Sequence, residues 1–312
     1  MVAAQVFESE VYFTAPNGGK PGKTWYKIHG KLEKSSLPPV ISLHGGPGSG
    51  HESLSPLKQL YEKYGIPVIF YDQVGCGRST HYREKMGDES FWTFDLFIQE
   101  LDNLVDHLQL RKRGFFVIGQ SWGGMLGAVY AARHPEGLQK LIISSSPSSV
   151  PLYLVGSAKL RSELPQDIRE ALESSDHESL EYKRASEFYY KKHVCRLDPR
   201  PEDIETAFRH LEDDSTAYMT IQGPSELVIS GSIKDWEGWK IAHQINVDTL
   251  VLNGRYDEIT DICVEPWFRV IPRVKWVTFE NASHMAHWEQ PERYLQVCGN
   301  FLSGYNSESR DS

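Results

Sequence analysis

The segment Phe115-Phe-Val-Ile-Gly-Gln-Ser-Trp-Gly-Gly124 decides the fold, because it joins an apolar strand to a helix through a single serine. Residues 115–118 form a short apolar run that predicts a buried strand, and residues 123–133, rich in alanine and glycine, predict a helix. Residues 119–123 match G-x-S-x-G, in which the glycines permit a sharp turn that leaves the serine hydroxyl free. The alternative is an incidental serine in a tight turn, but this context favours Ser121 as a nucleophile in a strained backbone conformation.

Strand and helix signals alternate on both sides of this segment. Other short apolar or alternating runs predict further strands, at residues 8–13, 25–30, 40–43, 68–71, 141–144, 249–252 and 275–279. Residues 92–108 carry apolar side chains at helical spacing, with Thr93 as the N-cap, and a final helix begins at Pro291. Short apolar strands separated by helices predict an α/β protein with a mostly parallel central sheet and helices on both faces.

The strand pattern is interrupted between residues 150 and 240, where the chain is mostly helical and strongly charged. Helical spacing is clearest at residues 178–196. We therefore predict an α/β core formed by residues 1–149 and 241–304, with residues 150–240 inserted as a helical cap. The cap should lie over the carboxyl ends of the strands, where open α/β sheets bind ligands. The polar residues 305–312 predict a disordered tail.

A nucleophilic serine needs a carboxylate and a histidine base, which follow a serine of this kind in the order Ser, acid, His. Asp257 comes five residues after the predicted strand at 249–252, where the acid should lie. Asp261 is the local alternative, although it could instead cap the following helix, a role that Thr260 could share. His284 follows the last predicted strand and is the expected base, with His287 beside it in a packing or substrate-lining role. This H-x-x-H pair has no third ligand cluster near it in the sequence, so we predict no metal.

The developing oxyanion needs two backbone N–H donors. One is expected from Trp122, the residue after the nucleophile, and the other from Gly46 in the loop His44-Gly-Gly-Pro-Gly48. A phosphate-binding role for this loop is the alternative, but it lacks the Gly-Lys-Ser/Thr ending of a P-loop. We predict no cofactor. Several aromatic residues could line an apolar side-chain pocket or belong simply to the core: Trp122, Phe188, Tyr189, Tyr190, Trp236, Trp239 and Trp288.

The 312 residues include 33 basic and 42 acidic side chains, which give a formal net charge of −9. An acidic chain without a run of lysine and arginine argues against nucleic acid or membrane as a partner. The N-terminal residues lack a signal-peptide pattern, and no apolar run is long enough to cross a membrane. Four scattered cysteines without a C-x-x-C pair indicate free thiols, so we predict a cytoplasmic protein.

Three motifs together resemble the proline iminopeptidase family of α/β-hydrolases: His44-Gly-Gly-Pro-Gly48, Asp72-Gln-Val-Gly-Cys-Gly-Arg-Ser79 and Gly119-Gln-Ser-Trp-Gly-Gly124. The resemblance covers residues 7–302 and implies the α/β-hydrolase fold. Proline-specific members usually have arginine at the position of Val74, so the resemblance does not imply strict specificity for proline.

Residues 218–226, followed by 232–236, are similar to the cap of the tricorn-interacting aminopeptidases within this family. The resemblance implies that Glu226 and Glu258 bind the free α-ammonium group of the substrate and that Tyr218 lines the same site. Two carboxylates around an ammonium group make charge-assisted hydrogen bonds. They also reject substrates without the amine, because unpaired buried carboxylates are unfavourable.

We therefore expect a serine hydrolase that cleaves the amide bond after the free N-terminal residue of short peptides, through an acyl-enzyme. The alternative is an amidase or esterase that acts on amino-acid derivatives or small metabolites with the same machinery. A non-catalytic binding protein is the least favoured reading, because the expected triad and both glycine loops are intact. The expected partner is a short peptide or an amino-acid-derived small molecule, and the oligomeric state stays open.

Overall fold

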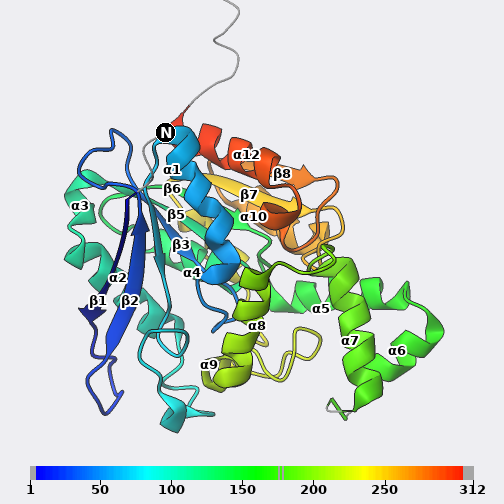
Figure 1. Ribbon diagram of the computed structural model, residues 1–312. Coiled ribbons are helices and arrows are strands. Elements are labelled where there is room, and N and C mark those ends of the chain that lie inside the picture. The colour runs from blue at the N-terminus through cyan, green and yellow to red at the C-terminus, as the bar shows by residue number, and fades with distance from the viewer. Residues whose placement is uncertain (1–4, 175, 178, 305–312) are drawn as a thin grey trace, which may run out of the picture.

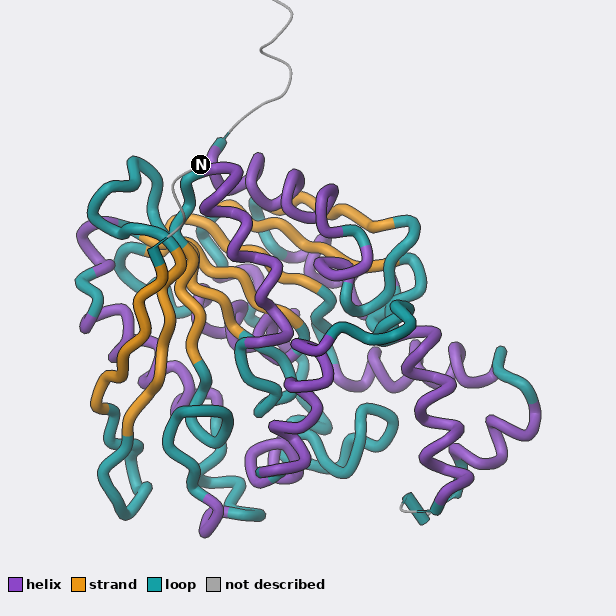
Figure 2. The backbone as a smooth tube through the Cα atoms, viewed as in Figure 1, coloured by secondary structure: helices purple, strands orange, loops and turns teal. Residues whose placement is uncertain are grey.

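The computed structural model describes residues 5–174, 176–177 and 179–304, so the tail predicted at residues 305–312 lies outside the described residues. One eight-stranded sheet runs through the molecule, and helices cover both of its faces (Figure 1, Figure 2). This arrangement confirms the predicted α/β class with its mostly parallel sheet.

The strands follow the order β1-β2-β4-β3-β5-β6-β7-β8 across the sheet. Their bounds are β1 (Val6–Tyr12), β2 (Lys23–His29), β3 (Val40–Leu43), β4 (Val68–Tyr71), β5 (Phe115–Gln120), β6 (Leu138–Ser144), β7 (Asp248–Gly254) and β8 (Val274–Phe279). β2 pairs antiparallel with both β1 and β4, and the remaining neighbours are parallel. Parallel neighbours need long crossover connections, which explains why apolar strands alternate with helices in the sequence.

The helices of the described chain differ widely in length. The α-helices are α1 (Gln59–Tyr64), α2 (Phe94–His107), α3 (Leu110–Arg113), α4 (Trp122–Ala132), α5 (Val150–Ser162), α6 (Gln166–Leu172), α7 (Leu180–His193), α8 (Glu202–Asp213), α9 (Thr216–Ile221), α10 (Asp261–Val270), α11 (Ala286–Glu289) and α12 (Pro291–Ser303). Short 3-10 helices are η1 (Glu52–Lys58), η2 (Arg83–Lys85), η3 (Gly238–Lys240) and η4 (Ala242–Gln244). Thr93 caps α2 as predicted, since its hydroxyl accepts the backbone N–H of Leu96 at 3.3 Å.

Side chains of the central strands alternate between two cores, one on each face of the sheet. Phe115 and Val117 of β5 belong to the core that includes residues of α2, α4 and α10. Phe116 and Ile118 belong to the core that includes residues of α1 and α12. Successive side chains of a strand point to opposite faces, and here both faces are covered by helices. This is why the strand is apolar at every one of these positions.

The helical insert, residues 150–240, contains α5 to α9 and η3 (Figure 1). None of its described residues belongs to the eight-stranded sheet. Residues of α7, α8 and α9 line the same cavity as Ser121, which directly follows β5, so these helices lie at the carboxyl ends of the strands. The division into a core and a cap stays a prediction. The first helix of the insert, α5, begins at Val150, the residue at which the cap is predicted to begin.

Several predicted elements differ by a few residues from the observed ones, and two of these differences bear on the site. The helix predicted at residues 178–196 ends at His193, because the chain then runs against the loops of Glu258 and His284. β5 extends two residues beyond the predicted strand, through Gln120, so it leads directly into Ser121. The longer strand places the serine at the very end of the sheet.

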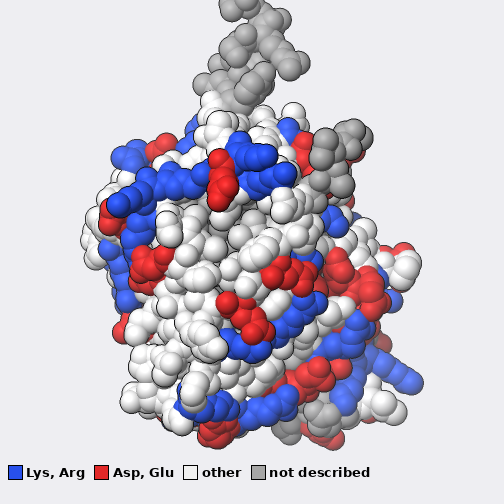
Figure 3. Space-filling view, turned by 60° about the vertical axis from the view of Figure 1, so that its left-hand side comes forward, with Lys and Arg blue, Asp and Glu red and all other residues white. Residues whose placement is uncertain are grey.

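The surface shows basic and acidic side chains interspersed on the face in Figure 3. Within the described part of the chain, no helix is both long and apolar enough to cross a membrane. All four cysteines are buried free thiols.

Candidate active site

Ser121 lies between β5 and α4 in a conformation that non-glycine residues rarely adopt. Its φ is 55° and its ψ is −124°. The turn around it is tight: a Cβ atom on Gly119 would lie 2.1 Å from the carbonyl oxygen of Gly123. A Cβ atom on Gly123 would lie 2.0 Å from the carbonyl oxygen of Leu43. Only glycine fits at both positions, which explains the G-x-S-x-G pattern and the strained serine between its glycines.

His284 and Asp257 are in direct contact, and both side chains are buried. Nδ1 of His284 lies 2.9 Å from Oδ1 of Asp257, and that oxygen also accepts the backbone N–H of Ile259 at 2.8 Å. The bond to Asp257 places a proton on Nδ1, so Nε2 is left for a reacting group. Burial alone would lower the pKa of His284, but Asp257, Glu258 and Glu226 together raise this pKa to about 9.

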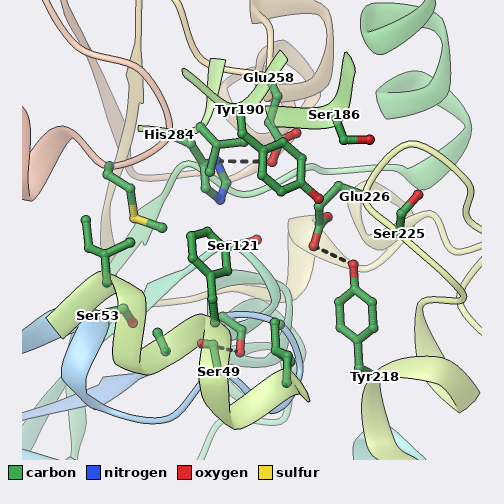
Figure 4. A pocket seen from close by; sticks show the side chains of 18 of the residues that line it. Ser49, Ser53, Ser121, Ser186, Tyr190, Tyr218, Ser225, Glu226, Glu258 and His284 are labelled. Carbon is green, nitrogen blue, oxygen red and sulfur yellow. Dashed lines mark hydrogen bonds and ion pairs between the residues drawn. The ribbon is translucent and has the colours of Figure 1, made fainter. Parts of the chain in front are cut away.

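Ser121 and His284 line the same cavity (Figure 4). In the described part of the chain, no hydrogen bond joins their side chains directly. Hydrogen bonds between a nucleophile and its base often tighten only in the substrate complex. The fold therefore brings the predicted nucleophile, base and acid to one place from three separate loops, with the base–acid bond already formed.

Asp261, the alternative acid, and His287, the neighbour of the expected base, have partners outside the triad. Oδ1 of Asp261 accepts a hydrogen bond from Nδ2 of Asn253 at 2.9 Å. Asp261 is the first residue of α10, and the N-cap position belongs to Thr260, so the alternative capping role for Asp261 is wrong. His287 is buried with Nε2 2.8 Å from the carbonyl oxygen of Ser53, and burial lowers its pKa to about 4. His287 therefore packs between the last loop and η1.

Gly46 and Trp122 both line a small cavity beside Ser121. Gly46 has a φ of 103°, and a Cβ atom there would lie 2.7 Å from the backbone nitrogen of Gly48. Trp122 is the first residue of α4, where a backbone N–H has no acceptor within the helix. Both predicted donor residues therefore lie next to the serine.

His44 holds the glycine loop, residues 44–48, in place through hydrogen bonds of its ring. Its Nδ1 lies 3.0 Å from the carbonyl oxygen of Gly45, and its Nε2 accepts the backbone N–H of Gln73 at 3.0 Å. Burial lowers the pKa of His44 to about 4, so the ring is neutral and donates through Nδ1. Oε1 of Gln73 accepts Nε1–H of Trp122 at 2.9 Å. One buried network thus joins the glycine loop to the start of α4.

Glu226 of the helical insert and Glu258 of the loop after β7 both line the cavity (Figure 4). The Glu226 carboxylate accepts hydrogen bonds from the Tyr218 hydroxyl at 2.9 Å and from Nε2 of Gln222 at 2.9 Å. The Tyr153 hydroxyl lies 3.1 Å from Oε2 of Glu258 and 2.9 Å from the backbone carbonyl oxygen of Glu226. Tyr153 therefore joins the two glutamates.

The electrostatic state of these glutamates is set by burial. Burial raises the pKa of Glu258 to about 8, and it also raises the pKa of Glu226. Oε1 of Glu258 lies 3.9 Å from Nδ1 of His284. Within the described residues, neither carboxylate has a lysine or arginine partner. A positively charged ligand between these two groups would lower their pKa values and stabilise both in the ionised form, so the pair is suited to bind a cation.

Two cavities meet at Ser121. The larger one has a volume of about 530 Å³ and extends between the core and the helical insert. The smaller one has a volume of about 20 Å³, and its apolar walls come from Trp122, Met125, Pro147, Val150, Ile229, Ile233 and Ile259. Among the aromatic residues singled out in the sequence, Trp122 lines the small cavity and Tyr190 the large one. Tyr189 instead belongs to a separate core within the insert.

Tyr153 and Gln222 are site residues that sequence reasoning missed. Gln222 lies within residues 218–226, and its spacing of four from Tyr218 at the end of α9 was an available signal. Tyr153 had no such signal, because it is 105 positions from Glu258 in the chain. Only the packing of α5 against the core brings these two residues together.

In the described part of the chain, His51, Glu52 and Asp72 have possible metal-ligand atoms within 4.8 Å of one another. Nδ1 of His51 lies 2.8 Å from Oδ1 of Asp72. Oε2 of Glu52 lies 3.1 Å from Nε2 of His210 on α8. These side chains are hydrogen-bonded to one another and to the insert, so internal hydrogen bonding accounts for the cluster.

The fold and the site define an α/β-hydrolase. Residues 38–291 match the family described as alpha/beta hydrolase fold. The chain is 37% identical to a proline iminopeptidase of Saccharolobus solfataricus over 287 residues, which cover 89% of this chain and 88% of the relative. It is 34% identical to a proline iminopeptidase of Thermoplasma volcanium, with 89% of this chain and 92% of the relative covered.

Two solved structures show the same relationship. The crystal structure of VinJ has a TM-score of 0.88 and 41% sequence identity, with 95% of this chain and 99% of that chain covered. A proline iminopeptidase of Mycobacterium smegmatis has a TM-score of 0.83 and 35% identity, with 94% of this chain and 98% of that chain covered. The protein is a hydrolase enzyme that belongs to the proline iminopeptidase family of α/β-hydrolases.

Proposed function

We propose that the protein is a serine aminopeptidase that cleaves the amide bond after a free N-terminal residue, through an acyl-enzyme. The name proline iminopeptidase, carried by its relatives, supports a peptide substrate. An amidase acting on amino-acid derivatives is the second candidate, and the 530 Å³ cavity favours it because such a volume admits groups other than one amino acid. We also propose a cytoplasmic location, which the four free cysteines support.

The observation that carries the proposal is the pair Glu226 and Glu258 beside Ser121. An α-ammonium group between the two carboxylates would receive charge-assisted hydrogen bonds in a site largely removed from water. It would also hold the carbonyl carbon of the same residue close to the serine, because ammonium and carbonyl are separated by one carbon atom. The pair thus selects a free N-terminus and positions it for attack.

In the proposed mechanism, Ser121 attacks the carbonyl carbon while Nε2 of His284 takes the hydroxyl proton. Asp257 keeps the imidazole in the required tautomer and stabilises its protonated form. The backbone N–H groups of Gly46 and Trp122 stabilise the oxyanion. His284 then gives the proton to the leaving amine, and water releases the aminoacyl group by the same steps in reverse order.

The small cavity would receive the side chain of the N-terminal residue. Most of its lining side chains are apolar, with Tyr153, Gln222 and Glu226 at its polar side, and its volume is about 20 Å³, little more than one water molecule occupies. We therefore propose a small apolar first residue, such as alanine or proline. A long side chain would require the walls to move, and an acidic one would bring a second negative charge close to Glu226.

A comparison of paired substrates tests the proposal. Alanyl-2-naphthylamide should be hydrolysed, and its N-acetyl derivative should not. Glu226→Gln and Glu258→Gln should each lower kcat/KM for the free-amine substrate by about 10- to 150-fold, since each removes a charge-assisted contact of about 1.5–3 kcal/mol. Glu292→Gln on the exposed face of α12 is the control and should leave kcat/KM unchanged.

Hydrolysis of an alanine-like ester that lacks the amine should be much less affected by the two glutamate variants. An equal loss on substrates with and without the amine would contradict the proposed role of these glutamates. It would indicate a general esterase in which Glu226 and Glu258 are structural.

A further inference from the structure

We infer that the large cavity selects substrates whose amine half carries no carboxylate, so that aminoacyl amides and amide-blocked peptides are preferred over free dipeptides. This inference rests on the proposed function and concerns the other half of the substrate. Two observations support it. The leaving amine lies in the large cavity at Ser121, and the charged residues that line this cavity are mostly acidic.

The leaving amine must lie in the large cavity. His284 lines the large cavity, and the small cavity has no contribution from His284 among its lining residues. The group that donates a proton to the leaving amine must be within hydrogen-bond reach of it. The side chain of the N-terminal residue would occupy the small cavity beside Trp122, and its ammonium group would lie between Glu226 and Glu258 at the start of the large one.

The charged residues that line the outer part of the large cavity are mostly acidic. Glu187, Glu205 and Glu212 lie on α7 and α8, in addition to the glutamate pair at the ammonium site. Nε of Arg200 lies 2.7 Å from Glu205, and its Nη1 lies 3.1 Å from Glu187. Lys183, the other basic residue of the lining, also has an interaction partner.

A free dipeptide would bring its α-carboxylate into this acidic surrounding. That carboxylate is two bonds from the scissile nitrogen, so it cannot extend past the cavity while the carbonyl is at Ser121. Arg200, the arginine of the lining, is already paired with two carboxylates, and a third would have to compete with them. The acidic lining is therefore a repulsive element against a C-terminal carboxylate close to the cleaved bond.

The same cavity offers apolar surface to an uncharged amine. Its wall includes Tyr190 of α7, Ile204, Phe208 and Leu211 of α8, and Met285 next to the expected base. The rings of Tyr190 and Phe208 are nearly parallel, with centroids 6.2 Å apart. A bulky apolar amine, or a longer peptide whose carboxylate lies outside, would bury its surface here without an unpaired charge.

The test compares alanyl-phenylalanine with alanyl-phenylalaninamide, which share the acyl group and the scissile bond and differ in one charge. Both α-amines have pKa values near 8, so at a single pH near 8 the two compounds present similar fractions of protonated amine while part of His284 is unprotonated. We expect kcat/KM for release of alanine to be at least about 10-fold higher for the amide at low ionic strength. This ratio should shrink as salt screens the repulsion.

Glu212→Lys places a cation in the cavity wall and should reduce the ratio, mainly by improving hydrolysis of the dipeptide. Glu292→Lys on α12 makes the same change in net charge far from the cavity and should leave the ratio unchanged. Equal rates for the two compounds, or faster hydrolysis of the dipeptide, would overturn the inference and leave the proposed function intact. No release of alanine from either compound would overturn the proposed function itself.

Discussion

The backbone carbonyl oxygen of His193, at the end of α7, lies 3.2 Å from the backbone nitrogen of His284. The same oxygen lies 3.2 Å from the backbone nitrogen of Glu258. One carbonyl group of the helical insert therefore joins the loop of the expected base to the loop of the expected acid. His193 is itself held in place, because its Nδ1 lies 2.9 Å from the carbonyl oxygen of Tyr256.

Replacing His193 with phenylalanine keeps a ring but removes the donor to Tyr256. We expect kcat to fall about 10- to 100-fold with a smaller change in KM, because small displacements of reacting groups strongly reduce the rate. Asparagine keeps a donor close to the position of Nδ1 and should restore most of kcat. Steady-state kinetics of both variants, with Tm as the control, measure this effect. A lowered Tm with unchanged kcat would mean that His193 only stabilises the fold.

The role proposed for Ser121 predicts that Ser121→Ala abolishes turnover and leaves the fold intact. Alanine fits the turn, since it has the same Cβ atom and lacks only the hydroxyl. The variant should keep the wild-type Tm and should not react with a fluorophosphonate probe, which labels the wild-type enzyme covalently. A small residual rate from binding and the oxyanion donors is compatible with this prediction. Near-normal turnover of Ser121→Ala would contradict this prediction.

The contact between Asp257 and His284 predicts a steep loss in Asp257→Asn. The amide would favour the wrong imidazole tautomer, and kcat should fall by about 10³- to 10⁴-fold. Asp261→Asn is the matched control, because its amide oxygen can still accept the hydrogen bond from Asn253. This control should keep nearly full activity in the same assay. A steep loss of kcat in Asp261→Asn, with nearly full activity in Asp257→Asn, would assign the role of the triad acid to Asp261.

The carboxylates around His284 predict a bell-shaped pH profile. Burial opposes the charged imidazole, but Asp257, Glu258 and Glu226 outweigh it and raise the pKa of His284 to about 9 in the free enzyme. A base must be unprotonated, so kcat/KM should rise with pH along the acid limb. The substrate amine loses its proton with a pKa near 8, so recognition by the glutamates declines over the same range and kcat/KM should pass through a narrow maximum between about pH 8 and 9.

The same charges predict the effect of Glu258→Gln on this profile. Removing one nearby negative charge lowers the pKa of His284, so the acid limb of kcat/KM should move to lower pH. The measurement is kcat/KM against pH for the variant and the wild type with one free-amine substrate. An acid limb that stays in place would assign it to a group other than His284.

No proposed step uses a metal ion or a disulfide, so activity should survive EDTA and a reducing agent. His51, Glu52 and Asp72 make this test informative, because possible metal-ligand atoms of these three residues lie close together in the described chain. Activity lost with EDTA and restored by zinc would assign a metal to that cluster. Loss with reducing agent alone would contradict the free state of the cysteines.

Sequence reasoning predicted the elements whose signals are local. The turn around Ser121 depends on glycines within two residues of it, and their close contacts require glycine whatever the rest of the chain does. The apolar strands were recognisable because helices cover both faces of the sheet. Asp257 and His284 could be placed for a related reason: each follows a strand, and parallel strands end at one edge.

The tertiary structure decided which distant residues complete the site. Tyr153 of α5 binds Glu258 across 105 positions of the chain, and His193 contacts both loops through a backbone carbonyl that no side-chain pattern reveals. The charge balance of the large cavity depends on how α7 and α8 pack over the sheet and pair Arg200 with its glutamates. Such contacts arise when the insert packs on the core, because burial and pairing depend on neighbours in space and the periodicity of a sequence records only neighbours along the chain.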